Sequence, residues 1–469
     1  MFDPKPYSMK ILAVVIGLLF MISCSRSSQV KPDQHIRNID SFAVVVVDRQ
    51  PTSGVIQWSV AKNIHNADTV KYKIELNGRF VDSNLLQLRD TIRSLSPDTT
   101  YYGRVYAYTK SGDTASAPFA LEMAKGYIFL GGTDNSLYCY EIYSGKRIWK
   151  SETHVISGNA IDIPTVENNV LYVNDANSSI VAFDAKTGAK KWKNIFDVSP
   201  HVFANQSNPL YINGRLYTTM NNGIYALNAS TGDTIWRYPT ADNFANNPVM
   251  AGNILITSTP HSEGTMLAVR AETGAKLWER EYSTSVCINP VVYNNLVISY
   301  TSAGTLFAFK PETGEVAWSK QTVRGFGAPI IYKDLVILQT GGQVLALKAA
   351  DGTNVWSYSY SSSSVSSPCV GNDMVYFSVP GKAVALKAAT GELAWERLYG
   401  SPAEWSTPIC VKSRVYFGHN VLWGYGTWVL SAATGEVVAN IAGDVQQEGG
   451  NAIVYDDTTY YLPESGMVQ

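Results

Sequence analysis

Residues 182–192 read AFDAKTGAKKW, and the same pattern returns along most of the chain. It recurs as ALNASTGDTIW (226–236), AVRAETGAKLW (268–278), AFKPETGEVAW (308–318), ALKAADGTNVW (346–356) and ALKAATGELAW (385–395). Each copy places a Trp four residues after a Gly, and Trp149 follows Gly145 at the same spacing. The repeated residues are Trp149, Trp192, Trp236, Trp278, Trp318, Trp356 and Trp395. A period of roughly 40 residues indicates one structural unit per repeat.

Each repeat divides into four short segments of strand-forming residues. In the fifth repeat the predicted strands are 290–293, 296–300, 305–310 and 315–319. Four short antiparallel strands in about 40 residues are typical of a β-propeller blade. Repeats built from helix pairs would show a 3.6-residue period instead, and this period is absent from the sequence. The repeats therefore predict an all-β fold dominated by a propeller.

The two ends of the repeat region indicate how the propeller closes. An eighth turn, Thr434-Gly435, continues the period, but Ala439 stands where a Trp is expected. The eight turns predict an eight-bladed propeller over residues 124–469. Because the first repeat lacks its own first strand, residues 451–455 are expected to supply it and so protect the edges of the ring. Residues 458–469 look like part of another strand, to which the sequence assigns no place.

The repeat resembles the PQQ-like, or quinoprotein-type, repeat Ala-x-Asp-x-x-Thr-Gly-x-x-x-Trp. The resemblance implies that the seven Trp residues are core residues between blades rather than platforms for a ligand. It also implies that the Ala is small because the Trp of a neighbouring blade packs over it. Cys139 occupies the Ala position of the first repeat.

Residues 39–123 form a separate group of short alternating segments. Their number and spacing predict a β-sandwich. The segment Leu95–Tyr101, which reads LSPDTTY, resembles the turn into a late strand of fibronectin type III domains. The resemblance implies that the Tyr101 hydroxyl bonds back to the backbone and that Trp58 is buried. Such domains serve as spacers or docking modules, and nothing in this segment indicates catalysis.

The first 24 residues are expected to direct export. Lys10 precedes the apolar run 11–22, which is shorter than the roughly 20 residues of a membrane-spanning helix. The sequence Met21-Ile22-Ser23-Cys24 resembles a bacterial lipobox, although Met21 and Ile22 depart from the commonest residues. The resemblance implies a lipid on Cys24, a tether over 25–38 and an anchored protein of the cell envelope, expected at the outer membrane. The alternative is an ordinary secretory signal in which Cys24 is incidental.

Charge and cysteine spacing argue against several classes of function. The chain has 37 Lys and Arg against 39 Asp and Glu, so a nucleic-acid partner is not expected. The remaining cysteines, which show no CxxC spacing, are Cys139, Cys287, Cys369 and Cys410. Strand alternation predicts opposite faces for Cys369 and Cys410, so a disulfide between them is not expected. The loop histidines His154, His201, His261 and His419 lack paired ligand spacing, so no metal is expected.

The connections between blades are the candidate binding regions. They vary in sequence, and variable loops on a rigid scaffold commonly carry binding. Three of them contain Phe203, Phe244 and Phe326. In the eighth repeat, Trp405, Trp423 and Tyr425 are predicted to form an aromatic patch that could take up apolar side chains or stack on sugars. The alternative is that these loops pack on themselves. Trp428 lies in a strand position and is expected to be buried.

A lipobox followed by a ring of these repeats is similar to the BamB family, the lipoprotein subunit of the outer-membrane β-barrel assembly machine. The resemblance implies a non-enzymatic scaffold that binds an envelope protein partner through propeller loops and carries no cofactor. The added sandwich domain departs from that family. A surface glycan-binding lipoprotein is the first alternative. A dehydrogenase using PQQ and Ca²⁺ is the second, but adjacent cysteines and the long insertions of those enzymes are missing from this sequence.

Overall fold

A computed structural model of the chain describes most of the protein beyond residue 40. The described residues are 41–49, 52–62, 69–96, 99–110, 112, 114–123, 126–131, 136–142, 145–151, 164–175, 179–196, 207–220, 222–240, 246–258, 265–282, 287–325, 327–362, 367–398, 407–411, 413–421, 424–443, 452–455, 459–462 and 466–467. Their regular secondary structure consists of β-strands, as the all-β prediction requires. Within these ranges no helix has the length and apolarity that a membrane span needs.

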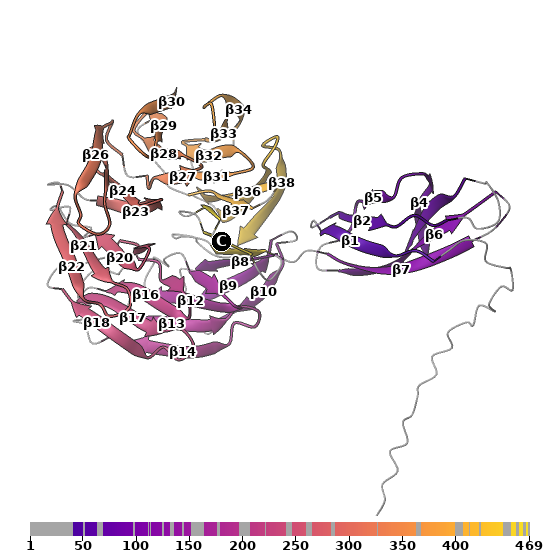
Figure 1. Cartoon of the computed structure of the whole chain (residues 1–469), viewed down its shortest axis with the longest axis horizontal. Helices are drawn as coiled ribbons and strands as arrows, with labels where there is room; N and C mark the ends of the chain where they lie inside the picture. Colours follow the sequence, from indigo (N-terminus) through magenta and orange to yellow (C-terminus); the bar gives the residue numbers. More distant parts are fainter. Residues whose placement is uncertain are drawn as a thin grey trace, which may run out of the picture. The chain divides into compact units, whose positions relative to one another are not determined.

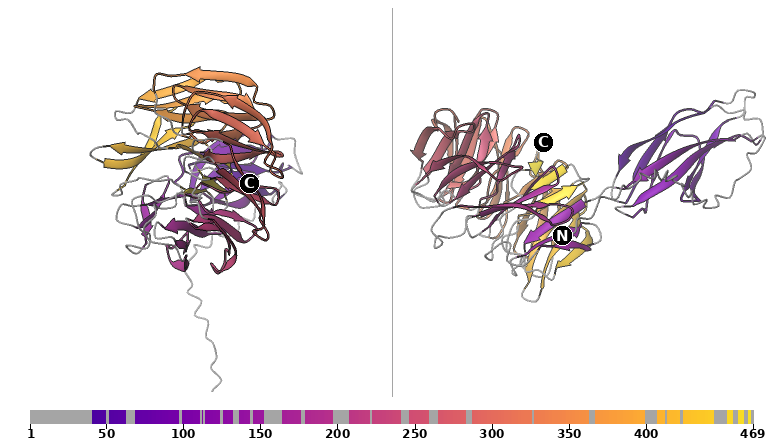
Figure 2. Two further views of the ribbon diagram at one scale, coloured as in Figure 1. Left: turned by 90° about the vertical axis from the view of Figure 1, so that its left-hand side faces the viewer. Right: turned by 90° about the horizontal axis from the view of Figure 1, so that it is seen from below.

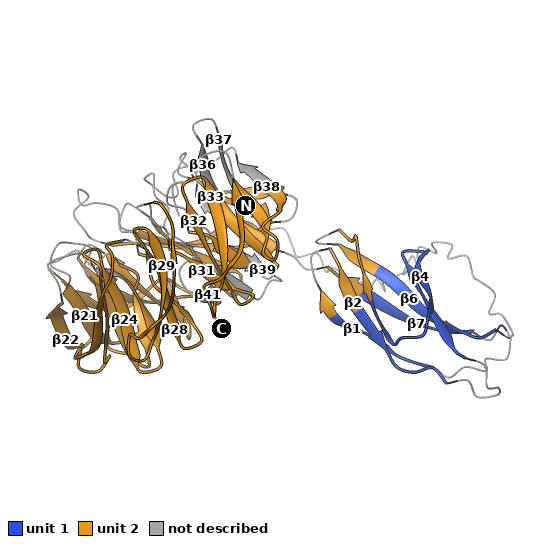
Figure 3. Ribbon diagram, turned by 90° about the horizontal axis from the view of Figure 1, so that it is seen from above, with its two compact units in different colours: residues 1–47, 56–90, 102–120 blue, residues 48–55, 91–101, 121–469 orange. Residues whose placement is uncertain are grey.

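The chain divides into two compact units, which Figure 3 colours separately. One contains residues 1–47, 56–90 and 102–120, and the other contains residues 48–55, 91–101 and 121–469. The division therefore passes through the strands that precede residue 123.

The strands between residues 44 and 122 form two sheets. The three-stranded sheet has the order β1-β2-β5, with β1 (Val44–Arg49), β2 (Gly54–Trp58) and β5 (Arg89–Ile92). The four-stranded sheet has the order β4-β3-β6-β7, with β3 (Lys71–Leu76), β4 (Arg79–Leu85), β6 (Thr100–Tyr108) and β7 (Thr114–Glu122). Trp58 of one sheet packs on Tyr72 of the other, with ring centroids 5.5 Å apart, and both side chains are buried. The backbone N–H of Ser96 donates a 2.8 Å hydrogen bond to the Tyr101 hydroxyl, so the predicted bond of this Tyr to the backbone is confirmed.

The strands from β8 onward follow one another as sheets around a ring (Figure 1), and the view from below shows them running between its two faces (Figure 2, right). One sheet has six strands in the order β10-β9-β8-β39-β40-β41, with β8 (Gly126–Gly131), β9 (Leu137–Glu141), β10 (Arg147–Lys150), β39 (Ala452–Tyr455), β40 (Thr459–Leu462) and β41 (Gly466–Met467). The next three sheets contain β11 (Thr165–Glu167), β12 (Val170–Asp175), β13 (Ser179–Asp184), β14 (Lys190–Ile195); β15 (Leu210–Ile212), β16 (Arg215–Met220), β17 (Gly223–Asn228), β18 (Thr234–Pro239); β19 (Val249–Ala251), β20 (Ile254–Ser258), β21 (Thr265–Arg270) and β22 (Lys276–Glu281).

Four further sheets of the same kind complete the series. They contain β23 (Cys287–Tyr293), β24 (Leu296–Thr301), β25 (Thr305–Phe309), β26 (Val316–Gln321); β27 (Ile330–Tyr332), β28 (Leu335–Thr340), β29 (Gln343–Lys348), β30 (Asn354–Ser359); β31 (Cys369–Gly371), β32 (Met374–Val379), β33 (Lys382–Lys387), β34 (Leu393–Leu398); β35 (Ile409–Val411), β36 (Arg414–Val421), β37 (Gly424–Ser431) and β38 (Val437–Gly443). Each is a simple antiparallel meander, which is the arrangement of a propeller blade.

The C-terminal segment joins the sheet that begins with β8. Strand β39 pairs antiparallel with β8, with Ile453 opposite Ile128, so the predicted role of residues 451–455 is confirmed. Strands β40 and β41 continue the sheet beyond β39, which gives the C-terminal segment the place that the sequence left open. They extend toward the inside of the ring, because β40 contacts the innermost strands β11 and β35 and β41 contacts β31.

Seven seams between neighbouring sheets are built in the same way. At each seam an indole N–H donates a hydrogen bond of 2.7–3.1 Å to a backbone carbonyl of the next sheet's turn. The pairs are Trp149–Ala185, Trp192–Ala229, Trp236–Ala271, Trp278–Pro311, Trp318–Ala349, Trp356–Ala388 and Trp395–Ala432. These rings are buried or half-buried between sheets rather than presented to a ligand.

The small residue beneath each indole is the turn Gly. A Cβ on Gly274 would lie 2.6 Å from Cε3 of Trp236, and a Cβ on the corresponding Gly of the other six turns would lie 2.5–2.9 Å from a Trp ring atom. The repeat Ala has a different position, because Ala268 lies opposite Trp278 of its own sheet. The prediction that a neighbouring Trp requires this Ala to be small was therefore wrong. The neighbouring indole requires the Gly, which also has a positive φ of 72° at residue 274.

Replacing Gly274 by Ala tests the indole contact, once the strain that any side chain causes at a positive φ has been subtracted. We expect Gly274→Ala to lower the free energy of unfolding by about 1–3 kcal/mol more than Gly252→Ala, because the added methyl overlaps the indole. Gly252 is the matched control, since its φ is also positive but a Cβ there would meet nothing within 4 Å. Thermal unfolding of both variants measures the difference, and equal losses would show that the indole can move aside.

Candidate functional site

The face of the ring from which the sheet-to-sheet connections arise rests on buried polar residues. The second strand of several sheets ends in such residues, namely Asn174, Thr219, Thr257, Thr301, Gln339, Thr340 and Ser378, all of them nearly or fully inaccessible. Buried polar groups need hydrogen-bond partners. Here the partners include the segments that lead into the next sheet, because Thr257 donates to the backbone oxygen of Asn246 at 3.0 Å. The segments that lead from the connections into the next sheet, here called stems, are therefore held rigidly on this face.

A ladder of side chains runs along the inner rim of the same face. In each pair, the donor is the backbone N–H of the residue that precedes the Pro at the start of a sheet. The acceptor is the side chain of the residue at the same position in the next sheet. Asn208 donates to Asn247 Oδ1 at 2.6 Å, and Asn247 donates to Asn289 Oδ1 at 2.9 Å. Ala328 donates to Ser367 Oγ at 2.9 Å. The sequence signal for this ladder is the Asn-Pro pair that recurs at the start of three repeats, whose periodic Asn predicts nothing until neighbouring sheets are placed side by side.

Two tyrosines hold the connections on either side of β27–β30. The Tyr300 hydroxyl donates to the backbone oxygen of Val323, and the Tyr360 hydroxyl donates to that of Thr340 at 2.6 Å. Gln339 donates to the Tyr360 hydroxyl at 3.1 Å and to the Ser378 oxygen at 3.0 Å. Burial raises the pKa of both phenols, so they remain neutral donors at physiological pH. Their arrangement suits anchoring of the backbone and provides no general base.

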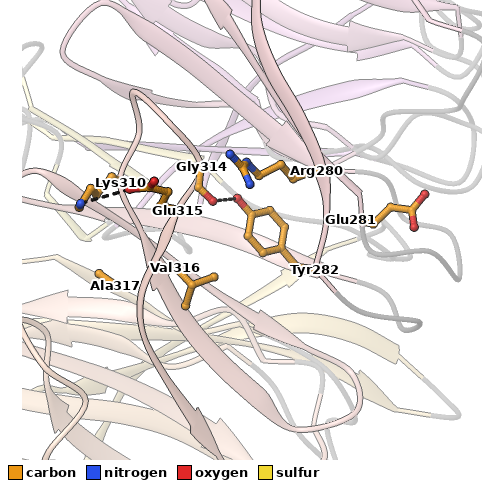
Figure 4. A pocket seen from close by; sticks show the side chains of 8 residues that line it. All are labelled: Arg280, Glu281, Tyr282, Lys310, Gly314, Glu315, Val316 and Ala317. Carbon is orange, nitrogen blue, oxygen red and sulfur yellow. Dashed lines mark hydrogen bonds and ion pairs between the residues drawn. The ribbon is translucent and has the colours of Figure 1, made fainter.

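A second candidate is an open groove of about 910 Å³ on the rim of the ring between β22 and β26. Figure 4 shows Tyr282 pointing at the turn of the next sheet, where its hydroxyl donates to the Gly314 oxygen at 2.6 Å. Arg280 donates to the Thr313 oxygen at 3.0 Å, and Lys310 pairs with Glu315 at 3.3 Å. These polar groups are engaged in joining the two sheets. The groove therefore belongs to the seam at Trp278, which joins the same two sheets.

The residues predicted to bind a partner fall largely outside the described part of the chain. Those outside are Cys24, Phe203, Phe244, Phe326, Trp405 and Trp423, together with His154, His201 and His261. The backbone of Tyr425 is described in β37, opposite Asn420, but its side chain is not. His419 is likewise described only as backbone in β36. The aromatic patch remains a prediction. Trp428 is half-buried against the cluster that contains Cys369, so the expectation of a buried position holds only in part.

Three cysteines are buried and carry free thiols, namely Cys139, Cys369 and Cys410. Burial raises the pKa of the Cys410 thiol to about 12 and also raises those of Cys139 and Cys369, which disfavours the thiolate that a nucleophile needs. Cys369 and Cys410 lie in one apolar cluster and are free thiols, so their predicted placement on opposite strand faces did not keep them apart. They belong to different sheets, and opposite faces of neighbouring sheets meet in the same seam.

The described residues contain no group of three or more His, Cys, Asp or Glu side chains placed to hold a metal ion.

Comparison with known proteins identifies the repeats. A family model described as "Outer membrane protein assembly factor BamB" matches residues 43–260, 205–280 and 221–440. Curated proteins with related sequence include the outer membrane protein assembly factor BamB of Burkholderia pseudomallei, 26% identical over 133 residues. They also include the quinoprotein alcohol dehydrogenase PedH of Pseudomonas putida, 24% identical over 172 residues, and a tetrathionate hydrolase of Acidithiobacillus ferrooxidans, 27% identical over 125 residues.

These matches cover only parts of the proteins compared. The alignments span 26% of this chain and 29% of BamB, 34% and 23% for PedH, and 25% and 25% for the tetrathionate hydrolase. The chain thus spans about a quarter of the length of the curated relatives it matches. Among solved structures, the quinohemoprotein alcohol dehydrogenase of Comamonas testosteroni is similar, with a TM-score of 0.50, 14% identity and coverage of 73% of each chain. This last likeness concerns the fold alone.

Removing one hydrogen bond of the ladder should lower the stability of the ring. We expect Asn247→Ala to lower the free energy of unfolding by about 1–3 kcal/mol, because the half-buried N–H of Asn208 loses its acceptor. The exposed turn residue Asn253 provides the control, and Asn253→Ala should change stability by less than about 0.5 kcal/mol. Thermal or urea unfolding compares the two, and an Asn247→Ala variant as stable as the control would show that the ladder is dispensable.

Proposed function

This chain belongs to the BamB family, and we propose on that premise that it is a non-catalytic scaffold of the cell envelope that binds a protein partner through the loop face of its propeller. The observation that carries the proposal is the anchoring of that face. Buried Thr, Asn and Gln residues and the Asn ladder fix the stems from which the connections project. Loops that differ in sequence while their stems are held rigid are suited to recognition.

The finer architecture belongs to the same proposal. Residues 39–123 would form a fibronectin type III-like domain and residues 124–469 an eight-bladed propeller. The buried Trp58 and the Tyr101 hydrogen bond support the first assignment. The seven indole seams and the pairing of β39 with β8 support the second. The partner would be a protein of the outer membrane, and Trp405, Trp423 and Tyr425 would contribute to its binding.

A lipid on Cys24 would place the scaffold at the membrane, with residues 25–38 as tether. Replacing Cys24 by Ser should then move the protein from the detergent phase to the aqueous phase in a Triton X-114 partition, because multiple acyl chains are what would hold it at a bilayer. Ser23→Ala serves as the matched change beside it and should leave the partition unaltered. A wild-type protein found in the aqueous phase would contradict lipid anchoring.

Photo-crosslinking from two positions of one sheet tests the loop face. Arg324 lies exposed in the connection that enters β27, and Asp351 lies exposed in the opposite turn between β29 and β30. A photoreactive residue at 324 should capture a membrane protein in intact cells, whereas the same residue at 351 should capture none. Capture confined to 351, or capture at neither position, would contradict binding through the loop face.

The enzymatic alternatives are tested on the purified chain. PedH is a quinoprotein alcohol dehydrogenase and another relative is a tetrathionate hydrolase, so both activities are the relevant comparisons. We expect neither dye-linked alcohol oxidation after addition of PQQ and Ca²⁺ nor tetrathionate hydrolysis. Turnover in either assay would overturn the non-catalytic proposal without bearing on whether the loop face binds a partner.

A further inference from the structure

The outward face of the four-stranded N-terminal sheet carries aromatic side chains where polar ones are expected. Alternation along β6 buries Gly103, Val105 and Ala107 and turns Tyr102, Arg104, Tyr106 and Tyr108 outward. An antiparallel sheet with one buried face normally presents polar residues on the other. Here Tyr102 is 69% exposed, and Phe80 of β4, which is separated from β6 by β3, is 56% exposed. Such exposed aromatic groups on a solvated face indicate a binding surface.

Three rings of this face surround one ammonium group. The Lys73 Nζ atom lies 4.1 Å from the ring centroid of Phe80, 5.4 Å from that of Tyr106 and 5.7 Å from that of Tyr108. Phe80 and Tyr106 meet edge to face with centroids 5.7 Å apart. Cation–π and edge-to-face contacts fix the orientation of rings that would otherwise rotate freely at a surface. The face is therefore ordered before any ligand arrives.

Hydrogen bonds hold the edges of the same rings. The Tyr106 hydroxyl donates to Glu75 Oε2 at 2.7 Å, and the Tyr108 hydroxyl donates to Asn84 Oδ1 at 3.1 Å. Burial and the Glu75 carboxylate raise the pKa of Tyr106, so its phenol remains a donor. A rigid aromatic surface loses little conformational entropy when a ligand settles on it.

The charge of this face indicates the kind of ligand. Lys71, Lys73 and Arg104 project from the outward positions of β3 and β6, and the Glu75 carboxylate is already engaged by Tyr106. Among the residues that the structure describes, none supplies a carboxylate within 4.0 Å of these three cations, and Arg104 donates instead to Ser116 Oγ at 3.0 Å. The surface thus combines ring faces with an excess of positive charge.

We propose that this aromatic face, made of Phe80, Tyr102, Tyr106, Tyr108, Lys73 and Arg104, binds an acidic polysaccharide. Aromatic rings can pack against the apolar faces of pyranose units, and the ammonium and guanidinium groups can pair with uronate carboxylates. Asn84 and Glu75, at the ring edges, can accept hydrogen bonds from sugar hydroxyls. A neutral glycan would use the rings and supply no carboxylate to the cations. This site is independent of the loop face and of the proposed scaffold role.

Affinity electrophoresis of the full chain tests the proposal. Native gels containing polygalacturonate, alginate or hyaluronan are compared with gels containing uncharged dextran. At least one acidic polymer should retard the wild-type chain at low salt, dextran should not, and added salt should weaken the retardation because it screens the charges. Retardation by none of the three acidic polymers, or equal retardation by dextran, would overturn the proposal.

Single substitutions distinguish binding to the aromatic face from non-specific attraction to positive charge. We expect Phe80→Ala to weaken binding about fivefold, as the loss of one aromatic contact implies. Lys73→Gln should weaken binding and reduce its dependence on salt. Val45→Ala is the matched control, because Val45 is 53% exposed on the other sheet, and it should bind like wild type. Unfolding temperatures check that each variant is folded.

Two results would assign the surface differently. Wild-type affinity of a folded Phe80→Ala variant would show that the rings do not contact the polymer. Binding of the chain to vesicles containing an anionic phospholipid, with no binding to any acidic polysaccharide, would make the face a membrane-contact surface. Either result would overturn the inference while leaving the crosslinking test of the loop face unaffected.

Discussion

The contact between an indole and the turn Gly of the next sheet is the interaction on which the ring depends. A four-stranded sheet alone exposes two apolar faces, so it must be covered on both sides by its neighbours. The indole covers the turn of the next sheet and donates one hydrogen bond to its backbone, at seven seams with nearly the same geometry. Gly is needed at this position for two reasons. The turn requires a positive φ, and the indole occupies the space that a Cβ would fill.

The seam between the last and first sheets is closed by another means. Ala439 stands at the indole position and packs against a cluster that contains Ile128, Tyr138 and Ile142 from the first sheet and Tyr416 and Val429 from the last. The closure comes instead from backbone pairing of β39 with β8. Hydrogen bonds along a strand join the first and last segments of the ring directly, whereas each indole joins one strand to the turn of the next sheet. The continuation into β40 and β41 adds contacts with inner strands of three other sheets.

The residues that make the ring stiff are different from those that are available for binding. The apolar seams give the ring its stiffness. Buried polar residues such as Thr257 extend that stiffness to the loop face, because they hydrogen-bond to the segments that lead into the next sheet. The buried thiols and phenols have raised pKa values and belong to this framework. The N-terminal sheet has a second kind of surface, in which rings are ordered by Lys73 while remaining exposed.

The sequence by itself determined the all-β class, the repeat and the closing strand, because the Trp and Gly spacing follows from a packing unit that each repeat builds locally. The strands predicted for the fifth repeat match β23–β26 to within a few residues, and β23 begins earlier through an irregularity around Pro290. Tertiary structure alone decided which residues face each other across a seam. Neighbouring sheets contribute opposite faces to one core, so strand alternation alone did not reveal that Cys369 and Cys410 meet there. The Asn ladder and the aromatic rings around Lys73 likewise arise only when residues far apart in the sequence come together.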